Sequence, residues 1–142
     1  ASEIMGLGGQ VSEAKGVDAT DSVGAAEASA IKLAKAHNIV VVITGETDFV
    51  TDGSRIARVS GGSPVMPLIT AMGCSLTCLM GGFVAVAPPM EAAATALALF
   101  AEAGSKAATE ANGPGSFQPL FLDALRNTTP QMLARSERIA WQ

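Results

Sequence analysis

The chain contains one unbroken run of β-branched residues, Ile39-Val40-Val41-Val42-Ile43-Thr44. A continuous apolar run of this length is typical of a strand that is covered on both faces of a parallel sheet. Residues 22–37, SVGAAEASAIKLAKAH, place apolar side chains at helical spacing among charged ones, with Ser22 available as N-cap and Asn38 as a stop. A helix that leads into a buried strand predicts an α/β fold with helices layered on a sheet.

The elements after this strand are mostly helical. Asp52-Gly53 lies between residues 48–51 and 54–59, and this pair suits the type I′ turn of a partly exposed hairpin. Beyond it we expect a short strand and four helices, at 66–70, 73–87, 90–111, 117–125 and 130–138. Ser116 is expected to cap the third helix, and Pro130 to start the fourth. Residues 94–100 read as a core face. Because helices outnumber strands, the chain is expected to be part of a larger fold.

Composition limits the classes of partner. The 142 residues are 49% hydrophobic and 15% charged, which predicts a globular domain with a sizeable core. A formal net charge of −4 disfavours nucleic acid and anionic membranes as partners and leaves small ligands or proteins. Cys74 and Cys78, four residues apart in a helix, suit neither a disulfide nor a zinc site, so we expect a reducing, cytoplasmic compartment. The first residues, ASEIMGLGG, do not read as a secretory signal.

The run from Val59 to Met90 carries no charge and is longer than a membrane span requires. Glycines and prolines divide it into pieces too short to cross a bilayer. We therefore expect a buried strand and a buried core helix here.

Two turns have residues suited to ligand binding, because ligands of α/β sheets bind where strands lead into loops. In the first, residues 44–48, Thr44 offers a hydroxyl and Gly45 permits close approach, while Glu46 and Asp48 could hold water or a cation. The alternative is a polar turn that leads into the hairpin.

The second turn, residues 69–76, opens a helix at Gly73. The amides of residues 71–74 would be free to bind an anion, and the same field would stabilise a thiolate at Cys74. The alternative is a cysteine packed in the core. Cys78, one turn later, is expected in the core, and the position of His37 at a helix end accounts for it without catalysis. Residues 113–117 read as a rigid loop and cap that could also close a site. The chain has no phosphate loop with a following lysine and no dinucleotide fingerprint.

Six segments in this order resemble the hydroxyethylthiazole kinase family of the ribokinase-like superfamily, over residues 1 to about 126 and roughly the second half of that family's chain. They are Ala1-Ser2-Glu3-Ile4, Lys15-Gly16-Val17-Asp18, Val42-Ile43-Thr44-Gly45-Glu46-Thr47-Asp48, Val50-Thr51-Asp52-Gly53, Thr70-Ala71-Met72-Gly73-Cys74, and Gly113-Pro114-Gly115-Ser116-Phe117 with Leu122-Asp123-Ala124-Leu125. The resemblance implies a layered ribokinase-like fold, with helices on both faces of a mostly parallel sheet. Residues 1–142 would form its C-terminal part, without the N-terminal half.

The resemblance also implies a reaction, the ATP-dependent phosphorylation of the hydroxyl of 4-methyl-5-(2-hydroxyethyl)thiazole in thiamine biosynthesis and salvage. The family acts as a homotrimer with thiazole sites between subunits, and uses Mg²⁺. The matching positions imply that Glu3 binds the metal ion and that Cys74 is the active-site cysteine. They imply that Ala71 contacts the substrate. The implied nucleotide- and phosphate-binding residues are Thr44, Gly45, Met72 and Gly73.

Phosphoryl transfer depends on positioning and on neutralising developing charge. Cys74 would lie beside the acceptor hydroxyl and accept its proton or orient it, and we favour orientation with partial base character. The family commonly has glycine where this chain has Ala71, and a smaller residue in place of Met72. We expect catalysis only when the missing half is supplied. The alternatives are a non-catalytic nucleotide- or ligand-binding fragment and a thiol hydrolase that uses Cys74 with His37.

Overall fold

The computed structural model describes residues 1–9 and 23–142. Contacts divide the chain into two compact units: Ala1–Val59 with Ala140–Gln142, and Ser60–Ile139. The expected cap at Ser22 and the motif at residues 15–18 lie outside the described residues.

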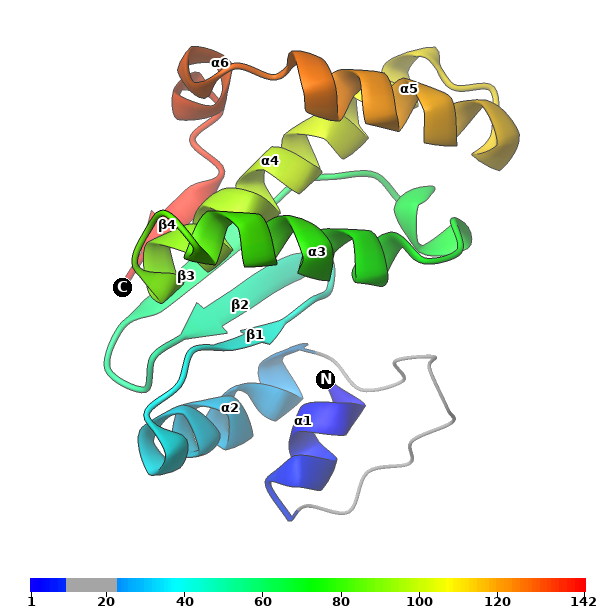
Figure 1. Ribbon diagram of the computed structural model, residues 1–142. Helices are drawn as coiled ribbons and strands as arrows, with labels where there is room; N and C mark the ends of the chain where they lie inside the picture. The colour runs from blue at the N-terminus through cyan, green and yellow to red at the C-terminus, as the bar shows by residue number, and fades with distance from the viewer. Residues whose placement is uncertain (10–22) are drawn as a thin grey trace. The chain divides into compact units, whose positions relative to one another are not determined.

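The first unit is built on helix α2 (Val23–His37), which confirms the helix predicted at 22–37. Three buried alanines of this helix, Ala26, Ala30 and Ala34, recur every four residues and so lie on one face. Asn38 has a φ of 53°, a left-handed conformation that asparagine adopts more readily than most residues, and it ends the helix as predicted. A short helix, α1 (Ser2–Leu7), lies beside α2 (Figure 1) and was not predicted.

Four strands form one sheet in the order β1-β2-β3-β4, with bounds Val41–Ile43, Thr47–Thr51, Ile56–Ser60 and Ile139–Trp141 (Figure 1). β1 and β2 are antiparallel, with Ile43 opposite Phe49. β3 and β4 are antiparallel too, since Ile56 and Gln142 exchange main-chain hydrogen bonds of 3.0 and 2.9 Å. The expected mostly parallel sheet is therefore wrong for the described strands, because the short loops after β1 and β2 reverse the chain, whereas a parallel partner needs a long crossover. β4 was not predicted.

The β2–β3 turn confirms the hairpin but not its type. Gly53 has a φ of 91°, whereas Asp52 does not have the positive φ that a type I′ turn needs at both central residues. Instead the Asp52 carboxylate accepts hydrogen bonds from the amides of Arg55 and Ser54, at 2.8 and 2.9 Å. These amides, together with the Arg55 side chain, lower the pKa of Asp52 to about 2.

Residues 66–70, near the start of the second unit, do not form the predicted strand. The strand predicted at 66–70 is a short 3-10 helix, η1 (Met66–Leu68). Pro67 has no amide for a sheet ladder. The amides of Leu68 and Ile69 donate instead to carbonyls three residues back, those of Val65 and Met66.

Helix α4 (Pro89–Glu110) is the core of the second unit, and α3 (Met72–Val84) and α5 (Pro114–Asn127) pack against it. The predicted core face at 94–100 is confirmed, since Ala94, Leu97 and Phe100 are at most 4% exposed. Phe100 meets Phe121 of α5 edge to face, with ring centroids 4.7 Å apart. Ser116 is not the N-cap of α5, because the helix already begins at Pro114 and Gly113 holds the cap position.

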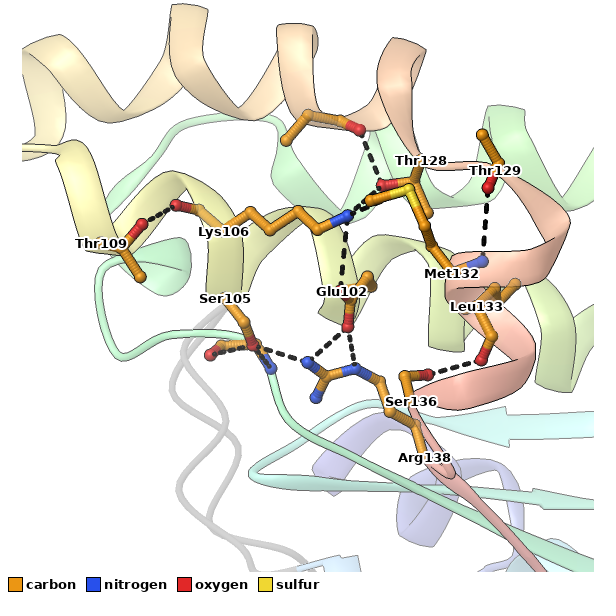
Figure 2. A network of polar contacts seen from close by, with 12 residues as sticks. Glu102, Ser105, Lys106, Thr109, Thr128, Thr129, Met132, Leu133, Ser136 and Arg138 are labelled. Carbon is orange, nitrogen blue, oxygen red and sulfur yellow. Dashed lines mark hydrogen bonds and ion pairs between the residues drawn. The ribbon is translucent and has the colours of Figure 1, made fainter.

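The C-terminal part of the second unit is fixed to α4 by a polar network (Figure 2). Arg138, which follows α6 (Pro130–Arg135), donates to the Glu102 carboxylate at 2.9 Å, and Lys106 lies 3.4 Å from the same carboxylate. Lys106 also donates to the Thr128 hydroxyl at 3.3 Å. Burial alone would raise the pKa of Glu102, but Arg138 and Lys106 together hold it below its usual value. Pro130 starts α6 as predicted.

Candidate functional site

Four of the predicted site residues lie at the start of α3, one at its N-cap and three in its first turn. Ala71 precedes the helix with a φ of 64°, and its carbonyl accepts the first hydrogen bond of the helix from the Ser75 amide at 3.0 Å. The Ser75 hydroxyl donates to the same carbonyl, also at 3.0 Å. The amides of Met72, Gly73 and Cys74 come before this bond, so they have no partner within the helix. This arrangement has the donors and the dipole direction that favour an anion.

Gly73 leaves this turn open. It is exposed, and a Cβ placed on it would have no atom within 4 Å outside its chain neighbours and its own helix backbone. Packing in the described chain therefore does not require glycine at this position. The absent side chain leaves the main chain accessible to close approach by a ligand.

Cys74 is exposed at the third position of α3, so the alternative of a cysteine packed in the core is wrong for the described structure. Cys78 is exposed as well, and its predicted place in the core is also wrong. The reason is the direction of the helix face: Leu76, which is buried, lies with the half-buried residues Met72, Leu79, Met80 and Phe83 on one side of α3. Cys74 and Cys78 occupy the opposite side. Because Leu76 is the one fully buried residue of α3, the expectation of a buried core helix is wrong too.

In the first unit, Thr44 and Gly45 follow β1 directly and both are exposed. The Gly45 amide donates to the Asp48 carboxylate at 2.9 Å, so this amide already has an acceptor within the turn. Burial raises the pKa of Asp48 to about 6, although the hydrogen bond from Gly45 acts in the opposite direction. Thr44 lies exposed at the end of a strand whose own side chains are largely buried.

Glu3 lies exposed in the first turn of α1, where the helix dipole favours a carboxylate. Within residues 1–9 and 23–142, no group of three or more His, Cys, Asp or Glu side chains could hold a metal ion. Glu3 therefore offers one oxygen ligand group and not a complete site.

The structure gathers Ala71, Met72, Gly73 and Cys74 on one turn of the second unit, while Glu3, Thr44 and Gly45 belong to the first. His37 is exposed as the last residue of α2, the helix-end position expected for it. Sequence reasoning missed the Asp48 contact with Gly45, which joins the loop after β1 to the second residue of β2. No helix in the described part of the chain is both long and apolar enough to span a membrane.

Comparisons with known proteins identify the family. The sequence model of the Hydroxyethylthiazole kinase family matches residues 1–131. A hydroxyethylthiazole kinase of Gemmatimonas aurantiaca is 57% identical over 141 residues, which are 99% of this chain and 51% of that protein. One from Cereibacter sphaeroides is 52% identical over 139 residues, 98% of this chain and 53% of that protein. The chain thus spans about half the length of the curated relatives it matches.

The solved structure of a hydroxyethylthiazole kinase protein from Pyrococcus horikoshii is similar to this chain with a TM-score of 0.79 and 32% sequence identity. The similarity covers 84% of this chain and 47% of that one. It confirms the predicted α/β class of fold.

Proposed function

The chain belongs to the hydroxyethylthiazole kinase family, and we propose that it forms part of a kinase that phosphorylates 4-methyl-5-(2-hydroxyethyl)thiazole with ATP. In this reaction the alcohol oxygen forms a bond to the γ-phosphorus, the bond from that phosphorus to the β–γ bridging oxygen of ATP breaks so that ADP leaves, and the alcohol proton passes to a base, for which Cys74 is the candidate. The observation that carries the proposal is the first turn of α3, where amides without a helical partner lie beside the exposed Cys74.

The roles within that turn follow from its chemistry. The amides of Met72 and Gly73 would donate to the phosphoryl oxygens, on which negative charge is spread during the transfer. Cys74 would orient the acceptor hydroxyl and take part of its proton. Ala71 would contact the thiazole, and Thr44 and Gly45 would contact the nucleotide. The Gly45 role fits least well, because its amide is already bonded to Asp48.

Glu3 would contribute to binding Mg²⁺, which prefers oxygen ligands and usually keeps several waters and substrate phosphates around it. A single exposed carboxylate fits that mode of binding. When bound, the ion neutralises charge on the phosphates.

We infer that residues 1–142 are the C-terminal part of one ribokinase-like domain, and that the N-terminal half completes the site. The length of the relatives supports this, since the chain matches 51% of the Gemmatimonas protein. The working assembly would be a homotrimer in the cytoplasm, and the chain alone would be inactive.

The test is co-expression of this chain with the part of the Gemmatimonas kinase that lies outside the match, followed by an assay of thiazole phosphorylation. Cys74→Ala is expected to lower kcat about 100-fold, in the range for loss of an acid–base group, and to leave the KM for ATP within about 3-fold. Cys78→Ala is the matched control, because this second exposed cysteine lies one turn further along the same helix. It should retain the parent kcat.

Two results would contradict the proposal. If Cys74→Ala and Cys78→Ala both turn over like the parent, the catalytic assignment is wrong. If the complex binds ATP without turnover, the chain is a non-catalytic nucleotide-binding part of the fold.

A further inference from the structure

The turn between β1 and β2 is held by one side chain. The Gly45 amide, in the middle of the turn, donates to Oδ1 of Asp48 at 2.9 Å. Asp48 is the second residue of β2, so this hydrogen bond ties the turn to a strand. Thr44 and Asp48 flank the last residue pair of the β1–β2 ladder, in which Ile43 lies opposite Phe49.

The part of β2 that presents Asp48 is anchored in the core. Phe49 and Val50, the next two residues, are both 0% exposed. Phe49 belongs to the same buried cluster as Val41 and Ile43 of β1 and the alanines of α2. Because protein interiors are closely packed, side chains buried in this way fix the main chain that carries them. The Asp48 carboxylate is therefore offered from a fixed position, and its hydrogen bond fixes the Gly45 amide in turn.

The carboxylate is a strong acceptor at neutral pH. Burial raises the pKa of Asp48 to about 6, which still leaves the group mostly ionised near pH 7. An ionised carboxylate accepts a shorter and stronger hydrogen bond than a neutral oxygen does. The side chain is also half-buried, so water competes less for the bond. The contact is thus suited to restricting the turn.

Glycine needs such a restraint, because without a Cβ it has a wide choice of backbone conformations. A turn that is free to vary loses that freedom when a ligand binds, and the lost entropy weakens binding. With the Gly45 amide held by Asp48, this entropy is lost on folding instead. The amide is then not available to a phosphate oxygen, which leaves the exposed Thr44 to make the polar contact from this turn.

We propose that Asp48 is a positioning residue for the nucleotide, which holds the Gly45 amide so that Thr44 is preset to contact ATP. This role rests on the proposed function, which places the nucleotide at Thr44 and Gly45. Asp48 acts through the turn and does not itself touch ATP. Loss of its hydrogen bond therefore weakens ATP binding and leaves the phosphoryl transfer step, which belongs to the first turn of α3, unchanged.

The test measures ATP binding and steady-state kinetics of this chain co-expressed with the part of the Gemmatimonas kinase outside the match. Asp48→Ala should raise both the Kd and the KM for ATP about 10-fold and keep kcat within about 3-fold of the parent. Asp48→Asn retains an acceptor oxygen and should stay within about 3-fold in all three constants. If the alanine variant does not fold, Asp48→Val replaces it, because valine suits a strand and has no acceptor.

Asp52→Ala is the matched control. The Asp52 carboxylate also accepts main-chain amides, those of Ser54 and Arg55, but it does so just after the other end of β2. This variant should unfold at a lower temperature and bind ATP like the parent. If it weakens ATP binding as much as Asp48→Ala does, the effect is one of general stability and the positioning role is wrong. If Asp48→Asn binds ATP as weakly as Asp48→Ala, the acceptor is not what matters and the role is wrong as well.

Thiazole phosphorylation by the same complexes tests the proposed function separately. An active complex in which Asp48→Ala keeps the parent's KM for ATP would overturn the role of Asp48 alone. A complex that binds ATP with the expected order of variants but does not phosphorylate the thiazole would overturn the proposed function alone. A parent complex that does not bind ATP would overturn both.

Discussion

Ala71→Gly should stabilise the protein. Ala71 has a φ of 64° and a ψ of 16°, the left-handed region in which a Cβ approaches the following carbonyl. Its side chain is exposed, so removing the methyl group leaves no cavity. The carbonyl that accepts from Ser75 is unchanged by the substitution.

The size of the effect is a balance of two terms. The left-handed conformation costs a residue with a Cβ about 1–2 kcal/mol. Replacing alanine by glycine removes this cost, but glycine has greater freedom in the unfolded chain, which lowers the stability gained by about 0.5–1 kcal/mol. The net gain is about 1 kcal/mol. A chain of 142 residues unfolds with an entropy of about 0.3 kcal/mol/K, so Tm should rise by about 3 °C.

Differential scanning calorimetry of the parent and variant measures this shift. Ala85→Gly is the control, because Ala85 is exposed at the other end of the same helix with an ordinary φ of −67°. Ala85→Gly should lower Tm. At a helical φ the substitution relieves no backbone strain, and glycine lowers the stability of a helix by up to about 1 kcal/mol. If Ala71→Gly lowers Tm as much as Ala85→Gly does, the left-handed turn is not strained and the reasoning fails.

Two further predictions concern charges. The pKa of Asp48 is about 6 in the folded protein and ordinary when unfolded, so the folded state binds the extra proton and stability falls as pH rises from about 4 to 6. Asp48→Asn can still accept from the Gly45 amide. Its free energy of unfolding, measured by urea titration, should rise relative to that of the parent by up to about 2 kcal/mol as pH goes from 4 to 7. A difference that stays constant with pH would contradict this. Arg138→Met should cost about 2 kcal/mol, because the Glu102 carboxylate, which is 15% exposed, loses its arginine partner and is left with Lys106 at 3.4 Å. Arg135→Met, at an exposed position, should change stability by less than about 0.5 kcal/mol, and equal losses in both variants would argue against the ion pair.

The parts of the fold that local patterns determine were predictable. α2 and α4 follow from helical spacing of apolar residues, and the ends at Asn38 and Pro130 follow from the backbone preferences of those residues. The failure at 66–70 also has a local cause, because Pro67 removes an amide that a strand would need. The short β4 could not be predicted, since its pairing with Ile56 joins residues far apart in the sequence.

The position of the candidate site at a helix start was predictable, but the exposure and hydrogen-bond partners of its residues were not. The helix start at Met72 is one residue from the predicted one, and the glycine and the cysteine were enough to indicate it. What the sequence could not give was the direction of the α3 face, which decides that Cys74 and Cys78 are both exposed. The hydrogen bond from the Gly45 amide to Asp48 was equally hidden, because the sequence pattern does not show which amide the Asp48 carboxylate accepts from.

The predictions for α3 and β1 were wrong in the same way, because the sequence predicted more covering neighbours than either element has among the described residues. The sequence between Val59 and Met90 carries no charge, as a buried segment would, yet most of α3 is exposed. The run at β1 is typical of a strand with two neighbours, yet among the described residues the strand has one. Hydrophobic patterns record the surroundings in which a sequence folds, and this chain matches about half of its relatives' length. The mismatch between pattern and exposure is therefore sharpest at α3 and β1, where an uncharged sequence forms a largely exposed helix and a strand with one neighbour among the described residues.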